Sequence, residues 1–240
     1  MSESLTWGAY ERLRPDQIEH IRAQTPLALV PWGALEWHSY HLPIGHDSLK
    51  AHALCHRLAE RTGGVVLPPV YAATDTIKPF KGFPHSIEHA EALVEQLAVS
   101  LMRQLIEEQF QVVVVVTGHA GGAHVDALKR AAETVQDEHP ECIVRAFPDF
   151  EHCDPEVLPA NHAAFGETAL QLALDPGPVE LARLPAGDPP TLDDDGVWGD
   201  DPRTATPEAG EHLVQHFVDR TATAIDSWIT QLANRPTTQP

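Results

Sequence analysis

Short apolar runs alternate with amphipathic stretches along most of the chain. Four runs have the length of buried strands, at residues 26–31, 65–70, 112–116 and 142–147. The run at 112–116 consists of five consecutive valines, which suits a parallel strand in the middle of a sheet with both faces covered. These runs predict the strands of a buried sheet.

Helical periodicity fills the intervals between the strands. We expect helices at residues 14–24, 48–62, 86–109, 125–137, 168–174 and 207–232. In the third of these, one apolar face is predicted from Leu93, Leu97, Leu101, Leu105 and Ile106. Strands that alternate with helices of this length predict βαβ units, hence a three-layer α/β/α sandwich around a mainly parallel sheet.

Two segments lack a core pattern. Residues 71–84 are predicted to form a loop, and the segment at 175–207, rich in Pro, Asp and Gly, is too long for a plain connector. Within it we expect the acidic trio at 193–195 to lie in a solvated loop. A length of 240 residues favours one domain, assigned to residues 1–234 and followed by a tail at 235–240.

Composition and charge exclude several classes of binding partner. The chain has 16 Lys and Arg against 35 Asp and Glu, a formal net charge of −19, which argues against nucleic acid and anionic membranes. Three cysteines are too few for a disulfide framework. The first 14 residues lack the apolar core of a signal peptide, and no apolar run is long enough to span a membrane. These features predict a cytoplasmic protein.

The densest candidate chemistry follows the first strand, where residues 36–47 contain two carboxylates, Glu36 and Asp47, and three imidazoles, His38, His41 and His46. An extended chain would point Glu36 and His38 to the same side, and Gly45 would let the backbone return Asp47 to that pair. Carboxylates and imidazoles suit zinc, manganese or iron. The alternative is a polar surface loop without a bound metal.

A second candidate follows the valine strand, at residues 117–124. Ligands of open α/β sheets bind beyond the carboxyl ends of strands, where His119 is predicted to lie. A glycine-rich turn could instead hold a phosphate, but the glycine spacing fits neither a Walker loop nor the dinucleotide fingerprint.

The stretch at 36–47 resembles E-x-H-G-x-H-L-P-x-G-T-D, the hallmark of the creatininase family of metal-dependent amidohydrolases. Ser39 stands where the family usually has Gly, and His46 where it usually has Thr or Ser. Three later stretches also resemble the family: 117–122 resembles N-G-H-G-G-N, 162–169 resembles H-A-G-E-x-E-T-S, and 196–210 resembles G-V-x-G-D-P-x-x-A-x-x-E-x-G. The likeness is weakest at 83–87, where His85 replaces a Gly of the family.

The resemblance implies a pair of divalent metal ions, Zn, Mn or Fe. Asp47 would bridge them, with Glu36 and His119 on one ion and His38 and Glu167 on the other. Some family members carry a metal-binding Glu at the position of Gly121, and we predict that Glu167 replaces it. Glu167 could instead cap the helix that follows it. The predicted catalytic residues are Glu167 and His162, the latter as proton shuttle, and the predicted substrate or outer-shell residues are His41, His85, Gly121, Gly122 and Trp198.

The resemblance predicts hydrolysis of a C–N bond in a small, possibly cyclic, amide or formamide by a metal-bridged hydroxide. A peptidase acting on a modified peptide and a non-catalytic metal-binding scaffold are the alternatives. A phosphoester hydrolase fits less well, because few Lys or Arg residues lie near the motifs. The family resemblance also implies a homo-oligomer, with a hexamer as the expected form.

Overall fold

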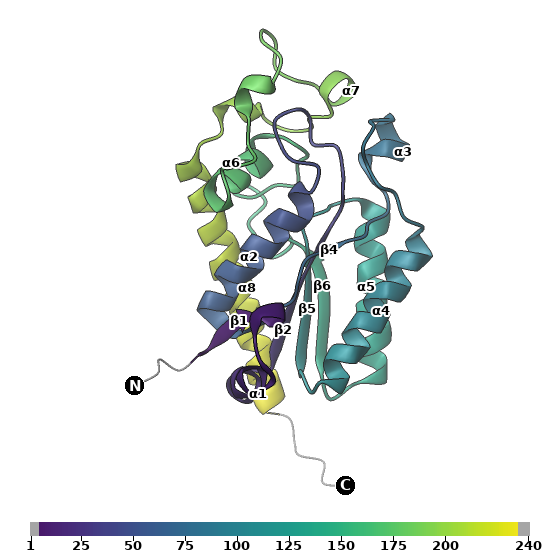
Figure 1. Cartoon of the computed structure of the whole chain (residues 1–240), viewed down its shortest axis with the longest axis vertical. Coiled ribbons are helices and arrows are strands. Elements are labelled where there is room, and N and C mark those ends of the chain that lie inside the picture. The colour runs from purple at the N-terminus through teal and green to yellow at the C-terminus, as the bar shows by residue number, and fades with distance from the viewer. Residues whose placement is uncertain (1–4, 235–240) are drawn as a thin grey trace.

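Six parallel strands form the central sheet of the computed structural model, which describes residues 5–234 (Figure 1). They run in the order β1-β3-β2-β5-β6, and β4 pairs with β2 further along the same edge as β3. The bounds are β1 (Trp7–Ala9), β2 (Leu27–Gly33), β3 (Gly64–Val66), β4 (Val70–Tyr71), β5 (Val112–Thr117) and β6 (Ile143–Pro148). The predicted parallel sheet is confirmed.

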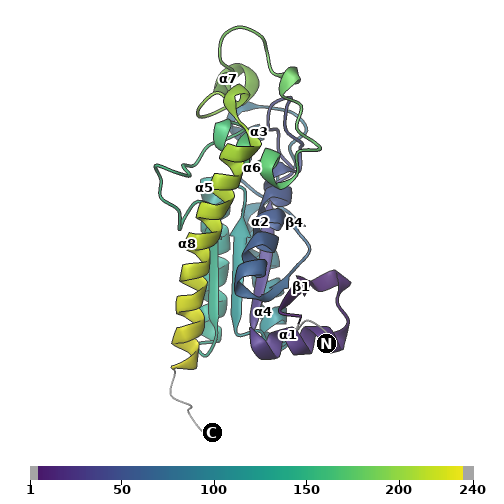
Figure 2. The same ribbon diagram turned by 90° about the vertical axis from the view of Figure 1, so that its left-hand side faces the viewer.

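Helices cover both faces of this sheet. Their bounds are α1 (Pro15–Gln24), α2 (His46–Thr62), α3 (Ile77–Lys81), α4 (Glu91–Glu107), α5 (Gly122–Glu138), α6 (Phe165–Leu174), α7 (Leu192–Asp195) and α8 (Pro207–Ala233). Helices α2, α6 and α8 pack on one face, and α4 and α5 pack on the other (Figures 1 and 2).

The valine strand shows why both faces are covered. Val112, Val114 and Val116 belong to the core beneath α2, α6 and α8, whereas Val113 and Val115 belong to the core beneath α4 and α5. Side chains alternate along a strand, so an unbroken apolar run supplies both cores. The predicted three-layer α/β/α sandwich is therefore confirmed.

Several element boundaries differ from the prediction. The apolar run at 65–70 divides into β3 and β4, because Pro68 and Pro69 cannot donate to the sheet. The predicted loop at 71–84 contains α3, and the acidic trio at 193–195 belongs to the single turn α7. Helices α2, α5 and α6 begin two or three residues earlier than predicted, which places Asp47 and Glu167 inside the first turn of a helix.

The predicted apolar face of α4 is wrong at Leu93 and Leu97 but right further along, where Leu105 is buried and Leu101 and Ile106 pack against the core. Leu93 and Leu97 are 53% and 41% exposed. The buried row consists of Val94, Ala98 and Met102, each one position after a predicted residue, together with the predicted Leu105. Both rows are apolar at helical spacing, so periodicity alone did not determine which one meets the core. The helix also begins at Glu91 rather than at residue 86, because Glu88 lies beside Ala73 in an isolated parallel bridge.

Among residues 5–234, no helix combines the length and the apolarity needed to cross a bilayer. The predicted tail at 235–240 lies outside the described residues. The assignment of residues 1–234 to one domain stays a prediction.

Ser39 carries a backbone strain that suggests a stability test. Its φ is 56°, and its buried hydroxyl has no hydrogen-bond partner. We expect Ser39→Gly to raise the free energy of unfolding by about 1 kcal/mol, because it removes a left-handed non-glycine residue and an unpaired buried hydroxyl. Urea unfolding would measure this change.

Ser86→Gly is the matched control. Ser86 is also buried, but its hydroxyl accepts a hydrogen bond of 3.0 Å from the Trp37 N–H. This variant should lose stability. A loss of stability in Ser39→Gly as well would contradict the strain argument.

Candidate metal centre

The candidate centre lies where the carboxyl ends of β2 and β5 meet. Trp32 and Thr117 are paired at these ends, and the chain then leaves β2 toward Glu36 and β5 toward His119. The first turn of α2 packs against the same edge. A Cβ atom at Gly118 would lie 2.2 Å from the carbonyl oxygen of Asp47, so only glycine allows this approach.

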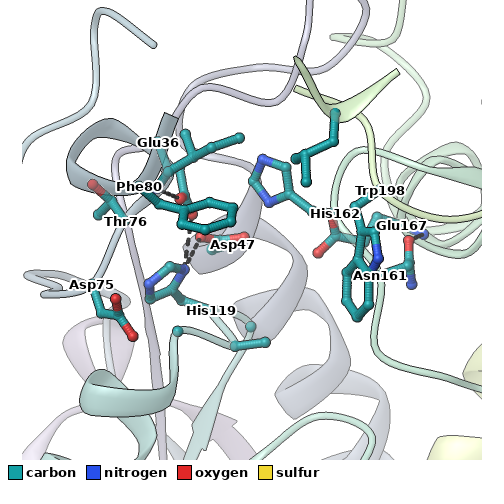
Figure 3. Close-up of a pocket in the computed structure, with 15 residues that line it drawn as sticks. Glu36, Asp47, Asp75, Thr76, Phe80, His119, Asn161, His162, Glu167 and Trp198 are labelled. Atoms are coloured by element: carbon teal, nitrogen blue, oxygen red, sulfur yellow. Dashed lines mark hydrogen bonds and ion pairs between the residues drawn. The ribbon is translucent and has the colours of Figure 1, made fainter. Parts of the chain in front are cut away.

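Asp47 lies between two imidazoles, with one carboxylate oxygen facing each. Its Oδ1 is 3.0 Å from Nε2 of His38. Its Oδ2 is 3.3 Å from Nδ1 of His119, as Figure 3 shows. Oε2 of Glu36 also lies 2.8 Å from the same nitrogen of His119, while Oε1 accepts a hydrogen bond from the Ile77 N–H. All four side chains are buried.

Backbone carbonyls orient both imidazoles. Nδ1 of His38 is 3.1 Å from the carbonyl oxygen of Glu36, and Nε2 of His119 is 3.1 Å from that of Thr74. A carbonyl only accepts, so each of these nitrogens carries the proton and donates it. Nε2 of His38 and Nδ1 of His119 therefore face the carboxylates, an orientation typical of metal-ligating histidines.

The buried carboxylates stabilise positive charge at the cluster, as the pKa values of its two imidazoles show. Burial alone would lower the pKa of His38, but Asp47 and Glu167 outweigh burial and raise the pKa to about 9. Burial opposes the charged form of His119 in the same way, and Glu36 and Asp47 raise its pKa. A cation at the carboxylates is favourable here, and a divalent metal would supply it in place of protons.

Several ligand atoms of the cluster are also free to bind a metal ion. Oε2 of Glu36, Nε2 of His38 and Oδ2 of Asp47 are buried without a hydrogen-bond partner. Two groups of ligand atoms, each within 4.8 Å of one another, share Asp47: one contains Glu36, Asp47 and His119, and the other contains His38, His46, Asp47 and Glu167. The structure thus brings together all five predicted ligands and adds His46.

Glu167 faces the ligand cluster and does not cap the helix, which were the two roles considered for it. Its Oε2 lies 3.5 Å from Nε2 of His38 and accepts a hydrogen bond of 2.7 Å from the Ala163 N–H, just before α6. Its Oε1 accepts a hydrogen bond of 2.7 Å from Nζ of Lys50. The carboxylate therefore holds the turn that leads into α6 without capping the helix, and it also faces the second group of ligand atoms.

Lys50 and Asp149 are charged residues of the site that the sequence reasoning missed. The buried Lys50 ammonium lies 3.0 Å from Asp149 and 2.7 Å from Glu167. Burial alone would raise the pKa of Glu167, but Lys50 and nearby imidazoles lower it to about 2. Burial raises the pKa of Asp149 to about 6 despite Lys50. A signal existed: Lys50 interrupts the apolar side of α2 one turn after Asp47, and Asp149 directly follows β6.

His162, the predicted proton shuttle, lies at the edge of the same cluster. Its ring is 4.3 Å from that of His38, and its Nε2 donates a hydrogen bond of 2.8 Å to the Trp37 carbonyl. Its Nδ1 is therefore the nitrogen that can exchange a proton. Burial, and then the charge of His38, lower the pKa of His162.

The remaining predicted residues lie at different distances from the centre. His41 is buried, and its Nε2 lies 2.8 Å from the hydroxyl of Thr168, next to Glu167. Trp198 is 54% exposed and lines the pocket mouth, whereas Gly122 begins α5. His85 is exposed, stacks on Trp37 and lies outside the pocket wall.

Gly121 has a local reason to lack a side chain. A Cβ atom there would lie 2.4 Å from the carbonyl oxygen of Asp75 and 2.7 Å from Nε2 of His119. Real Cβ atoms do not approach that closely, so this backbone has no room for the Glu that some family members carry at this position.

A pocket of about 390 Å³ opens above the cluster (Figure 3). Its floor contains the polar side chains of Glu36, Asp47, His119 and Glu167, and His162 forms one side. Apolar side chains complete the wall, namely Ile77, Phe80, Leu192 and Trp198.

Glu88 holds the segment that carries Thr74 and Ile77 to the ligands. Its Oε1 accepts hydrogen bonds from the Thr74 hydroxyl and the Asp75 N–H at 3.2 and 2.6 Å. Its Oε2 accepts from the N–H and the hydroxyl of Thr76 at 3.0 and 2.6 Å. Burial would raise the pKa of Glu88, but these bonds outweigh it and hold the pKa below its usual range.

Comparison with known proteins identifies the family. The family model described as creatinine amidohydrolase matches residues 11–225. The mycofactocin precursor peptide peptidase of Mycolicibacterium smegmatis is 28% identical over 229 residues, with 87% of each chain covered. The creatinine amidohydrolase of Pseudomonas putida is 27% identical over 252 residues, with 92% of this chain and 94% of the relative covered.

Solved creatininases share the fold. One creatinine amidohydrolase superposes with a TM-score of 0.77 at 24% identity, covering 94% of this chain and 98% of the other. A variant described as the Zn–Zn type and a creatininase described as the Mn form each reach 0.76 at 24% identity, covering 95% and 93% of this chain and 99% and 98% of the others. The chain belongs to the creatininase family, and the predicted family is confirmed.

The four hydrogen bonds that the Glu88 carboxylate accepts lead to a prediction about how stability depends on pH. We expect Glu88→Gln to lower the free energy of unfolding by about 1–3 kcal/mol at neutral pH, because an amide cannot accept all four hydrogen bonds. A depressed folded-state pKa gives stability that is present above the unfolded pKa of about 4.3 and is lost as pH falls through the folded pKa. The difference between the two proteins should therefore shrink at acidic pH.

Urea unfolding of both proteins at neutral and acidic pH would measure this difference. Glu133→Gln, on the exposed side of α5, is the matched control and should change stability little at either pH. A Glu88→Gln penalty that stays constant down to acidic pH would contradict a role for the ionised carboxylate.

Proposed function

We propose that this creatininase-family hydrolase cleaves a C–N bond in a small amide or formamide, using two divalent metal ions held around Asp47. The observation that carries the proposal is the position of Asp47, whose two carboxylate oxygens face different imidazoles at 3.0 and 3.3 Å. A carboxylate shared in this way is the usual bridge of a two-metal site.

Two sets of side chains would hold the ions. Glu36 and His119 would complete the first position, and His38 and Glu167 the second. Their mixed oxygen and nitrogen donors suit Zn, Mn or Fe. When bound, such ions lower the pKa of water toward neutrality and polarise a carbonyl oxygen. Solved family members described as Zn–Zn and Mn forms support this choice of metals.

His162 would move the proton that C–N hydrolysis requires. Because its Nε2–H is held by the Trp37 carbonyl, its Nδ1 can accept a proton and pass it to the leaving nitrogen. The lowered pKa leaves Nδ1 unprotonated near neutral pH, as a general base requires. Trp37 fixes the ring in turn, since its N–H binds Ser86 and its indole N–H binds the Asp195 carbonyl.

The pocket supports a small substrate. A volume of about 390 Å³ lies at the lower end for small-molecule sites. Phe80 and Trp198 offer aromatic surface opposite the polar floor, which suits a planar or cyclic amide. The volume and the aromatic walls of the pocket therefore favour a small amide or formamide as the substrate.

Cleavage of a modified peptide is the second candidate. The comparison with the mycofactocin precursor peptide peptidase favours it, because this relative matches about as well as the creatinine amidohydrolase. Exposed Phe80 and Trp198 leave room at the pocket mouth for a longer chain. A non-catalytic metal-binding scaffold is the remaining alternative. A homo-oligomer, in particular a hexamer, and a cytoplasmic location stay predictions.

Metal content tests the proposed centre. We expect the wild-type protein to contain about two equivalents of divalent metal per chain, and Asp47→Ala to lose most of both, because both positions share this carboxylate. Elemental analysis after desalting would measure the content, and circular dichroism would verify the fold.

Asp126→Ala, on the exposed side of α5, is the control and should keep the wild-type metal content. Metal-loaded wild type would then be assayed with small amides, formamides and short peptides. A wild-type protein that binds no metal would contradict the proposed function and favour a non-catalytic protein of the same fold.

His162→Gln tests the proton transfer. Glutamine can still donate a hydrogen bond to the Trp37 carbonyl but lacks an equivalent of Nδ1. We expect kcat to fall by about 10²–10⁴-fold while metal content stays unchanged, and the acidic limb of the pH–rate profile to disappear. Steady-state kinetics on the substrate found in the screen would measure both. Unchanged kcat would remove His162 from the reaction.

A further inference from the structure

His46 is a buried imidazole whose orientation is determined by its neighbours. Its Nδ1 lies 2.9 Å from Oε1 of Gln171. The amide of Gln171 is oriented in turn, because its Nε2 donates a hydrogen bond of 2.9 Å to the Asp175 carbonyl. Oε1 of Gln171 can therefore only accept, so Nδ1 of His46 must carry the ring proton.

The other nitrogen of His46 faces the ligand cluster with a free lone pair. Its Nε2 is buried, has no hydrogen-bond partner and lies 3.7 Å from Oε1 of Glu167. Oε1 of Glu167 accepts a hydrogen bond from Lys50, but no donor reaches Nε2 of His46. An unpaired lone pair in a buried site is unfavourable unless a cation approaches it. A histidine with only a packing role would not need to face a carboxylate in this way.

The distances match the spacing of ligands around one ion. Nε2 of His38 lies 3.0 Å from Asp47 and 3.5 Å from Glu167, close to the separation of about 3.3–3.4 Å between neighbouring ligands of tetrahedral zinc. The ring of His46 is 4.9 Å from that of His38. Nε2 of both histidines can therefore approach the same ion.

The second position is otherwise poorer in donors than the first. The backbone at Gly121 has no room for a side chain. Both oxygens of Glu167 already accept hydrogen bonds, from Lys50 and from the Ala163 N–H. The ammonium of Lys50 further offsets the negative charge that this carboxylate would offer to a metal.

We propose that Nε2 of His46 is a ligand of the second metal ion, in addition to His38, Asp47 and Glu167. This inference rests on the proposed metal-dependent function and adds a residue to it. His46 stands where the family signature usually has Thr or Ser, so the chain replaces an oxygen-rich position with one that contains two imidazoles. Such a set favours Zn, Co or Ni over Mn. The first position, with two carboxylates and one imidazole, should accept Mn more readily.

His46→Asn tests the ligand role with little other change. Asparagine can place an N–H near the position of Nδ1 and so keep the bond to Gln171, but it has no counterpart of Nε2. We expect the wild type to bind two Zn²⁺ per chain and the variant to keep one, with affinity at the second position weakened by at least about 100-fold. Calorimetric titration of the metal-free protein with Zn²⁺ and elemental analysis would measure both quantities.

His124→Gln is the matched control. His124 is equally buried near the cluster and has an unpaired Nδ1, but it belongs to none of the ligand groups. Glutamine keeps a polar atom near the Nε2 that contacts the Thr117 hydroxyl at 3.2 Å. This variant should keep two Zn²⁺. His46→Thr, the residue usual in the family signature, is a second variant if His46→Asn does not fold.

The outcomes separate this inference from the proposed function. Two Zn²⁺ in the folded His46 variants, with unchanged affinity, would overturn the ligand assignment but leave the two-metal centre. A single Zn²⁺ in the wild type, retained in His46→Asn, would also overturn it. Zinc edge X-ray absorption of the loaded wild type and of His46→Asn provides a check that does not depend on affinity. A decrease in imidazole scattering after His46→Asn supports direct ligation.

Discussion

Four buried carboxylates at one edge of the sheet impose the constraint on which the rest of the site depends. Glu36, Asp47, Asp149 and Glu167 are each at most 5% exposed. A buried charge costs several kcal/mol unless it is paired, so each needs a cation or hydrogen-bond donors. Lys50 serves Asp149 and Glu167, whereas Glu36 and Asp47 face imidazoles. This division leaves Asp47 as the place where further positive charge is most favourable.

The fold holds these charges together through backbone contacts that no ligand motif contains. Thr74 and Ile77, which orient His119 and Glu36, lie in a segment fastened by Glu88. The Trp37 carbonyl orients His162. Each ligand is thereby restricted before any substrate arrives, and such preorganisation is what allows a polar site to act without reorganising.

The departures from the family signature have different physical meanings. Ser39 and His85 both replace glycine at positive φ, of 56° and 63°, so they strain the backbone. Gly121 has no room for a ligand side chain. His46 instead adds a nitrogen donor to the cluster. The loss of one ligand position and the gain of another lie within the same second group, so the chain changes the chemistry of that position while it keeps the fold.

The sequence by itself determined the sheet, the alternation of layers and the types of ligand, because side-chain periodicity and motifs are local properties of the chain. It predicted that Glu36, His38, Asp47, His119 and Glu167 would meet, and the structure brings them together. Only the tertiary structure decided which apolar row of α4 faces the core, that Lys50 pairs with Glu167, and that Nε2 of His46 faces the cluster. These features depend on the packing of α2 against α6 and of α4 against α5, which join residues far apart in the chain. No local pattern records such contacts.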